Sequence, residues 1–163
     1  MKKLLAVLAA VAMPTAVSAQ TQRDVNELIE LIAGADTRVE FKSCGRRSHG
    51  YFRMLDGETL IAICTEETPL SNTALVWETV SHEATHLMQW CFGGNIVKDE
   101  HLEDIISETT EANPSFPRII MMYPESDRRS ETEAFWMETK SPEFVKYNLK
   151  RYCYPEKPFP IWR

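Results

Sequence analysis

A helix expected over residues 72–91 constrains this chain more than any other feature. Ser71 or Asn72 can cap its start, and Gly93-Gly94 can end it. Residues 81–86 read Ser-His-Glu-Ala-Thr-His, an H-E-x-x-H motif inside the helix. With 4 His in 163 residues, composition alone would produce about 0.01 such motifs in a chain of this length. The motif therefore calls for a chemical explanation.

His82 and His86 lie four residues apart, so a helix places both imidazoles on one face, about one turn apart. Two imidazole nitrogens in that position can bind one Zn²⁺ at about 2.0–2.1 Å. Glu83 follows His82 directly and can reach a water molecule in the open coordination position. Zinc lowers the pKa of such a water toward about 7, so Glu83 can accept its proton as a general base.

A catalytic zinc site needs a third protein ligand, and a Glu from a later helix is the best source. Glu131 is the preferred residue, because Ala134 follows three positions later and would let its helix approach the first one closely. Glu133 remains an alternative ligand. However, Ser130 and Glu133 also have the spacing of a capping box, which would give Glu133 a structural role.

These two segments resemble the gluzincin metallopeptidases, in which H-E-x-x-H is followed by a helix of E-x-x-A type that supplies the third ligand. The resemblance covers residues 72–91 and 126–139, and it does not identify a subfamily. It implies a minimal zincin-like α+β fold and a peptidase activity. Matched position by position, it implies zinc ligands at His82, His86 and Glu131 and a general base at Glu83.

Phe135 stands where many gluzincins have an Asp that orients the first His of the motif. The hydrogen-bond partner of His82 is therefore expected elsewhere in the chain, or as a backbone carbonyl. Tyr123 or His101 could donate a hydrogen bond to a developing oxyanion, and His101 is also a rival for the third ligand.

Residues 1–19 are typical of a cleavable signal peptide. Lys2 and Lys3 precede an apolar run at residues 4–13, and Val17-Ser18-Ala19 is a small-residue cleavage site. The apolar run is shorter than the roughly 20 residues that span a bilayer. We therefore expect a mature chain of residues 20–163 that is periplasmic or secreted and has no membrane contact after cleavage.

All four cysteines lie in the mature part of the chain, which suggests two disulfides in an oxidising compartment. Cys44 and Cys64 flank a predicted hairpin and could meet across it. This pairing would leave Cys91, at the end of the motif helix, for Cys153 near the C-terminus.

The remaining patterns predict a single α+β domain in which a small sheet precedes the motif helix and further helices follow it. Trp77, Trp90 and Trp136 are expected to build its core. The expected elements are a helix at 22–33, strands at 38–42, 51–55 and 59–64, helices at 72–91, 99–112 and 127–139, an irregular stretch at 114–124, and a last helix that begins at 141–142.

The formal net charge is −6, and it becomes −8 without Lys2 and Lys3. This acidic balance argues against nucleic acid or an anionic membrane as the partner. The expected function is an exported zinc-dependent peptidase that acts on peptide or protein substrates. Its sheet edge, assigned to residues 59–64, would hold an extended peptide, and a partner could complete a shallow cleft. The alternative is a zincin scaffold that binds metal or peptide without turnover.

Overall fold

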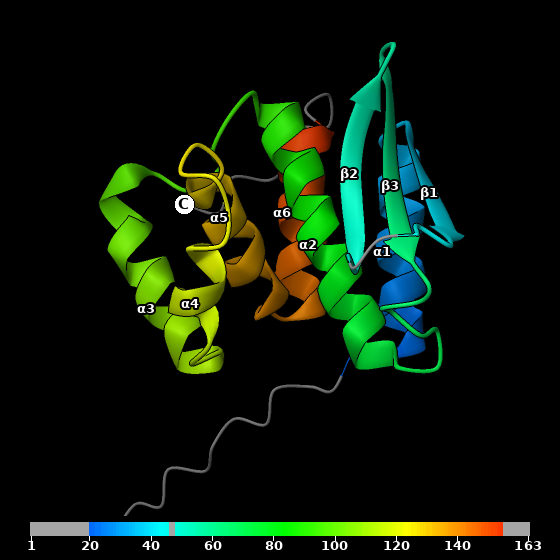
Figure 1. Ribbon diagram of the computed structural model, residues 1–163. Helices are drawn as coiled ribbons and strands as arrows, with labels where there is room; N and C mark the ends of the chain where they lie inside the picture. The colour runs from blue at the N-terminus through cyan, green and yellow to red at the C-terminus, as the bar shows by residue number, and fades with distance from the viewer. Residues whose placement is uncertain (1–19, 46–47, 155–163) are drawn as a thin grey trace, which may run out of the picture.

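The computed structural model describes residues 20–45 and 48–154, so the predicted signal peptide at 1–19 and the tail at 155–163 lie outside the described residues. The expected α+β class is confirmed, with a three-stranded sheet followed by helices (Figure 1). In chain order the elements are α1 (Gln22–Gly34), β1 (Thr37–Lys42), β2 (Gly50–Leu55), β3 (Glu58–Cys64), α2 (Thr73–Phe92), the 3-10 turn η1 (Asp99–His101), α3 (Leu102–Ala112), α4 (Phe116–Ile120), α5 (Arg128–Glu138) and α6 (Pro142–Cys153).

The sheet has the order β1-β3-β2, with β1 parallel and β2 antiparallel to β3. The predicted hairpin is confirmed, since Asp56 and Gly57 both have positive φ between the paired residues Leu55 and Glu58, as a tight two-residue turn requires. The assignment of residues 59–64 to the sheet edge is wrong. That segment is the central strand, because β1 pairs with its other side, and β2 is the edge strand beside α2.

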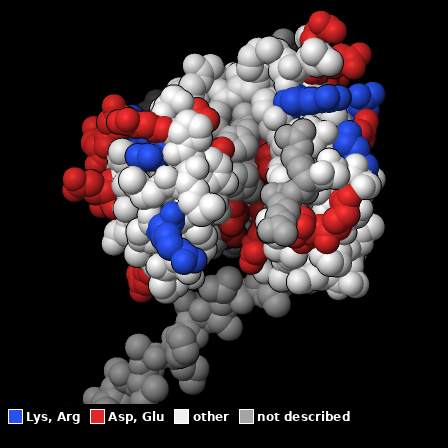
Figure 2. All heavy atoms as spheres, in the orientation of Figure 1, with Lys and Arg blue, Asp and Glu red and all other residues white. Residues whose placement is uncertain are grey.

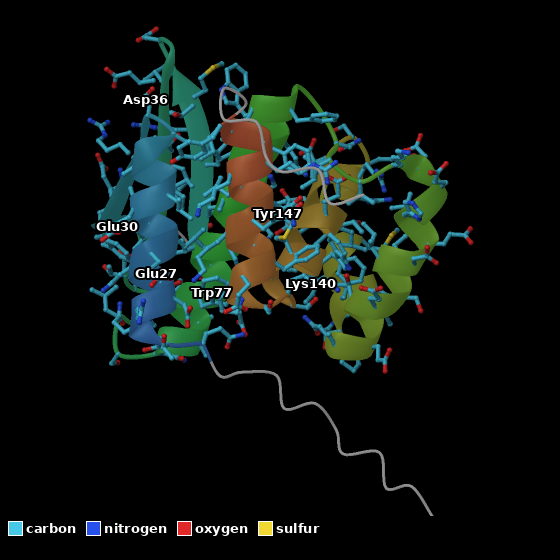
Figure 3. All side chains as sticks on the ribbon, turned by 180° about the vertical axis from the view of Figure 1, so that it is seen from behind. Glu27, Glu30, Asp36, Trp77, Lys140 and Tyr147 are labelled. Atoms are coloured by element: carbon cyan, nitrogen blue, oxygen red, sulfur yellow. A yellow bond between two sulfur atoms is a disulfide. The ribbon has the colours of Figure 1, made fainter. Side chains whose placement is uncertain are left out.

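Helices α1 and α2 pack on the sheet, and α2 also packs against α5 and α6 (Figure 1). From the sheet the core receives Val39, Phe52 and Ile61, which lie side by side on the three strands. Seen from behind, α1 and α6 lie next to each other, and Trp77 of α2 lies deep between them (Figure 3). Helix α2 is thus surrounded on several sides, and its unburied face opens toward β2 and α5.

Both expected disulfides are present, Cys44–Cys64 and Cys91–Cys153. The first ties the loop between β1 and β2 to the end of β3. The second ties the end of α2 to the end of α6, so the motif helix is anchored at its C-terminal turn.

The predicted start of α2 is confirmed, because the Asn72 side chain accepts a hydrogen bond from the Leu75 N–H. The stretch 114–124, expected to be irregular, contains the short helix α4, which has Pro117 in its first turn, where proline fits a helix. Among the described residues, no helix is both long enough and apolar enough to cross a membrane.

Candidate metal centre

Helix α2 presents a stripe of three residues at a spacing of four, His82, His86 and Trp90. Between positions 81 and 90 these three are the ones that are not buried. The side chains of His82 and His86 are 13% and 17% exposed, so both imidazoles are mostly buried but still reach the surface. Trp90 is 50% exposed, so its expected place in the core is wrong. Trp90 lies four residues after His86, and this spacing keeps the two side chains on the same face of the helix.

Helix α5 brings Glu131 to this stripe. Its Oε2 lies 3.2 Å from His82 Nε2, and its Oε1 lies 3.5 Å from His86 Nε2. The three side chains can each offer one ligand atom, and these atoms all lie within 4.8 Å of one another. Ala134 is fully buried one turn later, where a small residue suits the close packing of α5 on α2.

The other nitrogen of each imidazole has its own partner. His82 Nδ1 lies 2.5 Å from Glu138 Oε1, and His86 Nδ1 lies 2.9 Å from Gln89 Oε1. An imidazole whose Nδ1–H is donated to such an acceptor keeps its Nε2 lone pair for a metal. Both Nε2 atoms then face the Glu131 carboxylate.

Glu133, the alternative ligand, points away from this cluster and is fully buried. Its carboxylate accepts hydrogen bonds from the Ile96 and Val97 N–H groups and from the Gln89 side-chain amide. The capping box expected for Ser130 and Glu133 is wrong. Helix α5 begins before Ser130, and the Glu133 side chain spans to the connection after α2 instead.

Glu83 is buried between α2 and the edge strand β2. Its carboxylate accepts a hydrogen bond from the Phe52 backbone N–H. A Cβ at Gly50 would lie 3.0 Å from Glu83 Oε1 and 2.9 Å from the Ala62 carbonyl oxygen. Glycine at position 50 thus lets the strand pass close to this carboxylate, next to His82.

The acidic and basic groups of the centre perturb one another strongly. Burial alone would lower the pKa of His82, but hydrogen bonds to Glu131 and Glu138 outweigh it and raise that pKa to about 10. Burial raises the pKa of Glu83 to about 7, and burial lowers the pKa of His86. Without a metal, these shifts favour a protonated His82 ring beside Glu131 and Glu138 and a neutral His86 ring.

Two adjoining hollows meet at His82 and Glu83. We call them the Glu78 hollow, of about 330 Å³, and the Trp90 hollow, of about 510 Å³. Figure 2 shows this face hollowed between α3–α5 and the sheet, with acidic side chains in and beside the hollow. The Glu78 hollow is lined by His49, Leu75, Glu78, Phe135 and Glu138, and the Trp90 hollow by Tyr51, Phe52, His86, Trp90 and Glu131, while Ser48, Gly50 and Tyr123 line both.

The two candidates for oxyanion contact differ in position. Tyr123 lines both hollows and packs edge-on against Phe135. Burial raises its pKa to about 12, so its hydroxyl keeps the proton it would donate. The side chain of His101 is 58% exposed and lies beside Glu100 and Asp104, away from both hollows.

Sequence reasoning missed Glu138 and Gln89 as partners of the two histidines. Glu138 lies seven residues after Glu131, so a helix places both on one face, and that spacing was a usable signal. Gln89 lies three residues after His86, which is also contact spacing on a helix.

The donor set fits a zinc ion. Ligand atoms at about 2.0–2.1 Å from a tetrahedral metal lie roughly 3.3 Å apart. The Glu131 carboxylate approaches the two Nε2 atoms at 3.2 and 3.5 Å through a different oxygen in each case, so it lies within reach of an ion held by both imidazoles. Two imidazoles and one carboxylate leave a fourth position for water or substrate, as catalytic zinc sites do.

A protein-family model matches residues 17–154, and its description is "Domain of unknown function (DUF8637)". No curated protein and no solved structure matches the chain. The match covers most of the sequence, including every helix and strand described above. The chain therefore belongs to the DUF8637 family.

Proposed function

We propose that this protein is a zinc-dependent peptidase with a gluzincin-type centre. One observation carries the proposal: His82, His86 and Glu131 come from two helices and offer ligand atoms that lie within 4.8 Å of one another. The buried carboxylate of Glu83 follows the first of these ligands in the chain. Together they have the composition of a hydrolytic zinc site with a general base.

In this proposal His82, His86 and Glu131 hold the ion. Bound zinc supplies a Lewis acid that makes water a stronger acid and polarises a substrate carbonyl. Glu83 accepts the proton of the attacking water and passes it to the leaving amine. Burial favours this role, because it raises the pKa of Glu83 in the metal-free chain and so makes its carboxylate a better proton acceptor. Tyr123, which lines both hollows, would donate a hydrogen bond to the oxyanion.

An extended peptide is proposed to bind along β2, the edge strand that borders both hollows. The Cys64 N–H donates to the carbonyl of His49, the residue just before β2. Hydrogen-bonded and non-hydrogen-bonded pairs alternate along an antiparallel ladder, so every second residue of β2 turns its backbone N–H and C=O away from β3. Phe52 is one of these residues, and its N–H meets Glu83. A peptide that pairs with this edge would lie next to the proposed base.

Export to the periplasm or outside the cell belongs to the same proposal. Two disulfides and the signal-like residues 1–19 support it, since disulfides persist in oxidising compartments.

The test uses Glu83→Gln, which keeps the size of the side chain but cannot accept a proton. We expect cleavage of a mixed peptide library to fall about 10²–10⁴-fold, as loss of a general base does, while zinc content stays the same. Glu103→Gln, at an exposed position of α3, is the matched control. Zinc binding by the wild type without any cleavage would favour the alternative, a metal-binding protein without turnover.

A further inference from the structure

A buried chain of hydrogen bonds leads from His86 away from the metal centre. Gln89 stands at its middle and is 8% exposed. Its side-chain nitrogen lies 3.0 Å from the Ser130 carbonyl oxygen and 3.0 Å from Glu133 Oε2. Its side-chain oxygen lies 2.9 Å from His86 Nδ1.

The two nitrogen contacts fix the orientation of the Gln89 amide. A backbone carbonyl can only accept a hydrogen bond, so the NH₂ group must face Ser130. The Glu133 carboxylate accepts two backbone N–H bonds already, and it also acts as an acceptor toward Gln89. A flipped amide would place its oxygen against both acceptors, so the oxygen must face His86.

The amide oxygen in turn fixes the tautomer of His86. Because it can only accept, His86 Nδ1 must carry the proton, and Nε2 keeps its lone pair on the side of Glu131. This is the form that a metal binds.

Glu133 anchors this arrangement to another part of the fold. Its carboxylate holds the backbone of Ile96 and Val97, in the connection after α2, and Arg129 donates to the Val97 carbonyl. The Tyr152 hydroxyl donates to the Ile96 carbonyl from α6. The position of the amide is therefore set by α5, α6 and the segment after α2 together.

We propose that Gln89 is a positioning residue that holds His86 in its metal-binding tautomer, with Glu133 holding Gln89. The metal part of this inference rests on the proposed function. The tautomer part does not, because it follows from hydrogen bonds within the metal-free chain.

The test compares Gln89→Leu with Asn148→Leu. Asn148 is also an amide that is 8% exposed, but it lies on α6 and donates to the Phe144 carbonyl, so its loss controls for general destabilisation. Nitrogen-15 NMR of the histidine rings in the metal-free protein reads the tautomer directly. We expect the Nδ1–H form of His86 in the wild type and in Asn148→Leu, and a mixture of both forms in Gln89→Leu.

Competition with a chelator then measures zinc affinity. We expect Gln89→Leu to bind zinc about 10–100-fold more weakly, as loss of an outer hydrogen-bond partner of a ligand does. Asn148→Leu should stay within about twofold of the wild type. An Nε2–H tautomer in the wild type, or equal zinc affinity in Gln89→Leu and the wild type, would overturn the inference. A wild type that binds no zinc but shows the Nδ1–H form would refute the proposed function and leave the tautomer assignment standing.

Discussion

Two glutamates on α5, Glu131 and Glu133, have opposite surroundings although only one residue separates them. Glu133 is completely buried, and backbone N–H groups and an amide satisfy its carboxylate. The Glu131 side chain is 15% exposed, and its two carboxylate oxygens face the Nε2 atoms of two histidines in the cleft. The Glu133 carboxylate joins segments of the fold, whereas the Glu131 carboxylate lies where a cation can replace the proton of a neighbouring imidazole.

The difference shows how a helix separates structure from chemistry. Positions two apart on a helix point to different sides, so Glu131 faces α2 across the cleft and Glu133 faces the connection after α2. A carboxylate that is saturated by fixed donors has no capacity for a metal. A carboxylate that faces two imidazoles can bind a metal ion together with them, in place of the shared proton.

The largest expected effect is on zinc binding. Glu131→Gln removes a proposed ligand, so zinc affinity should fall by more than the roughly 10–100-fold that loss of an outer partner costs. Glu133→Gln should change zinc affinity far less, because the ligands stay in place. Chelator competition on both variants measures this. A larger loss in Glu133→Gln than in Glu131→Gln would reverse the roles given to the two residues.

The next effect is a pH dependence of stability in the metal-free protein. The pKa of His82 is about 10 in the fold and near 6.5 when unfolded, so its stabilising contribution is complete below pH 6.5 and is lost as the pH rises through 10. Glu83 acts in the same direction at lower pH, because its pKa is near 4.5 when unfolded and about 7 in the fold, so its contribution is lost as the pH rises through 7. We expect the free energy of unfolding to fall by a few kcal/mol between pH 6 and 10.

Denaturant titrations across that pH range measure the effect, with zinc removed by a chelator. His82→Gln should flatten the curve, whereas His101→Gln, at an exposed position, should leave it as in the wild type. An equally steep curve in His82→Gln would show that the charge on this histidine is not held by Glu131 and Glu138.

The smallest effect is the cost of Glu133→Gln to stability. An amide in place of this carboxylate turns an NH₂ group toward a backbone N–H, which leaves a buried donor unsatisfied. That change costs about 1–3 kcal/mol. Thermal unfolding in the presence of a chelator checks it, with Glu103→Gln as the exposed control. Unchanged stability would mean that Glu133 is not the structural member of the pair.

Much of the fold could be predicted because its signals are local. The Asn72 cap, the glycines after α2 and the turn at Asp56-Gly57 each fixed the end of an element. The position of β3 between its neighbours could not be predicted this way. Strand order depends on which strand pairs across the sheet, and residue alternation within a single strand does not contain that information.

The candidate site shows the same division. The spacing of His82 and His86 predicted their common face, and the sequence left Glu131 and Glu133 open because only tertiary packing sets the rotation of α5. Glu138 and Gln89 were missed, although each lies at helical contact spacing from a predicted ligand. Spacing shows which residues share a face, but it does not show which partner a side chain meets there.

The most direct test of the proposed zinc centre is a crystal structure of protein prepared with zinc, with diffraction data collected on both sides of the zinc absorption edge. We predict one anomalous peak per chain, within about 2.0–2.2 Å of His82 Nε2, His86 Nε2 and a Glu131 carboxylate oxygen. Glu138 and Gln89 should keep their bonds to the two Nδ1 atoms. No peak among the three proposed ligands in zinc-treated crystals, or a peak at Glu133 instead, would contradict the proposal.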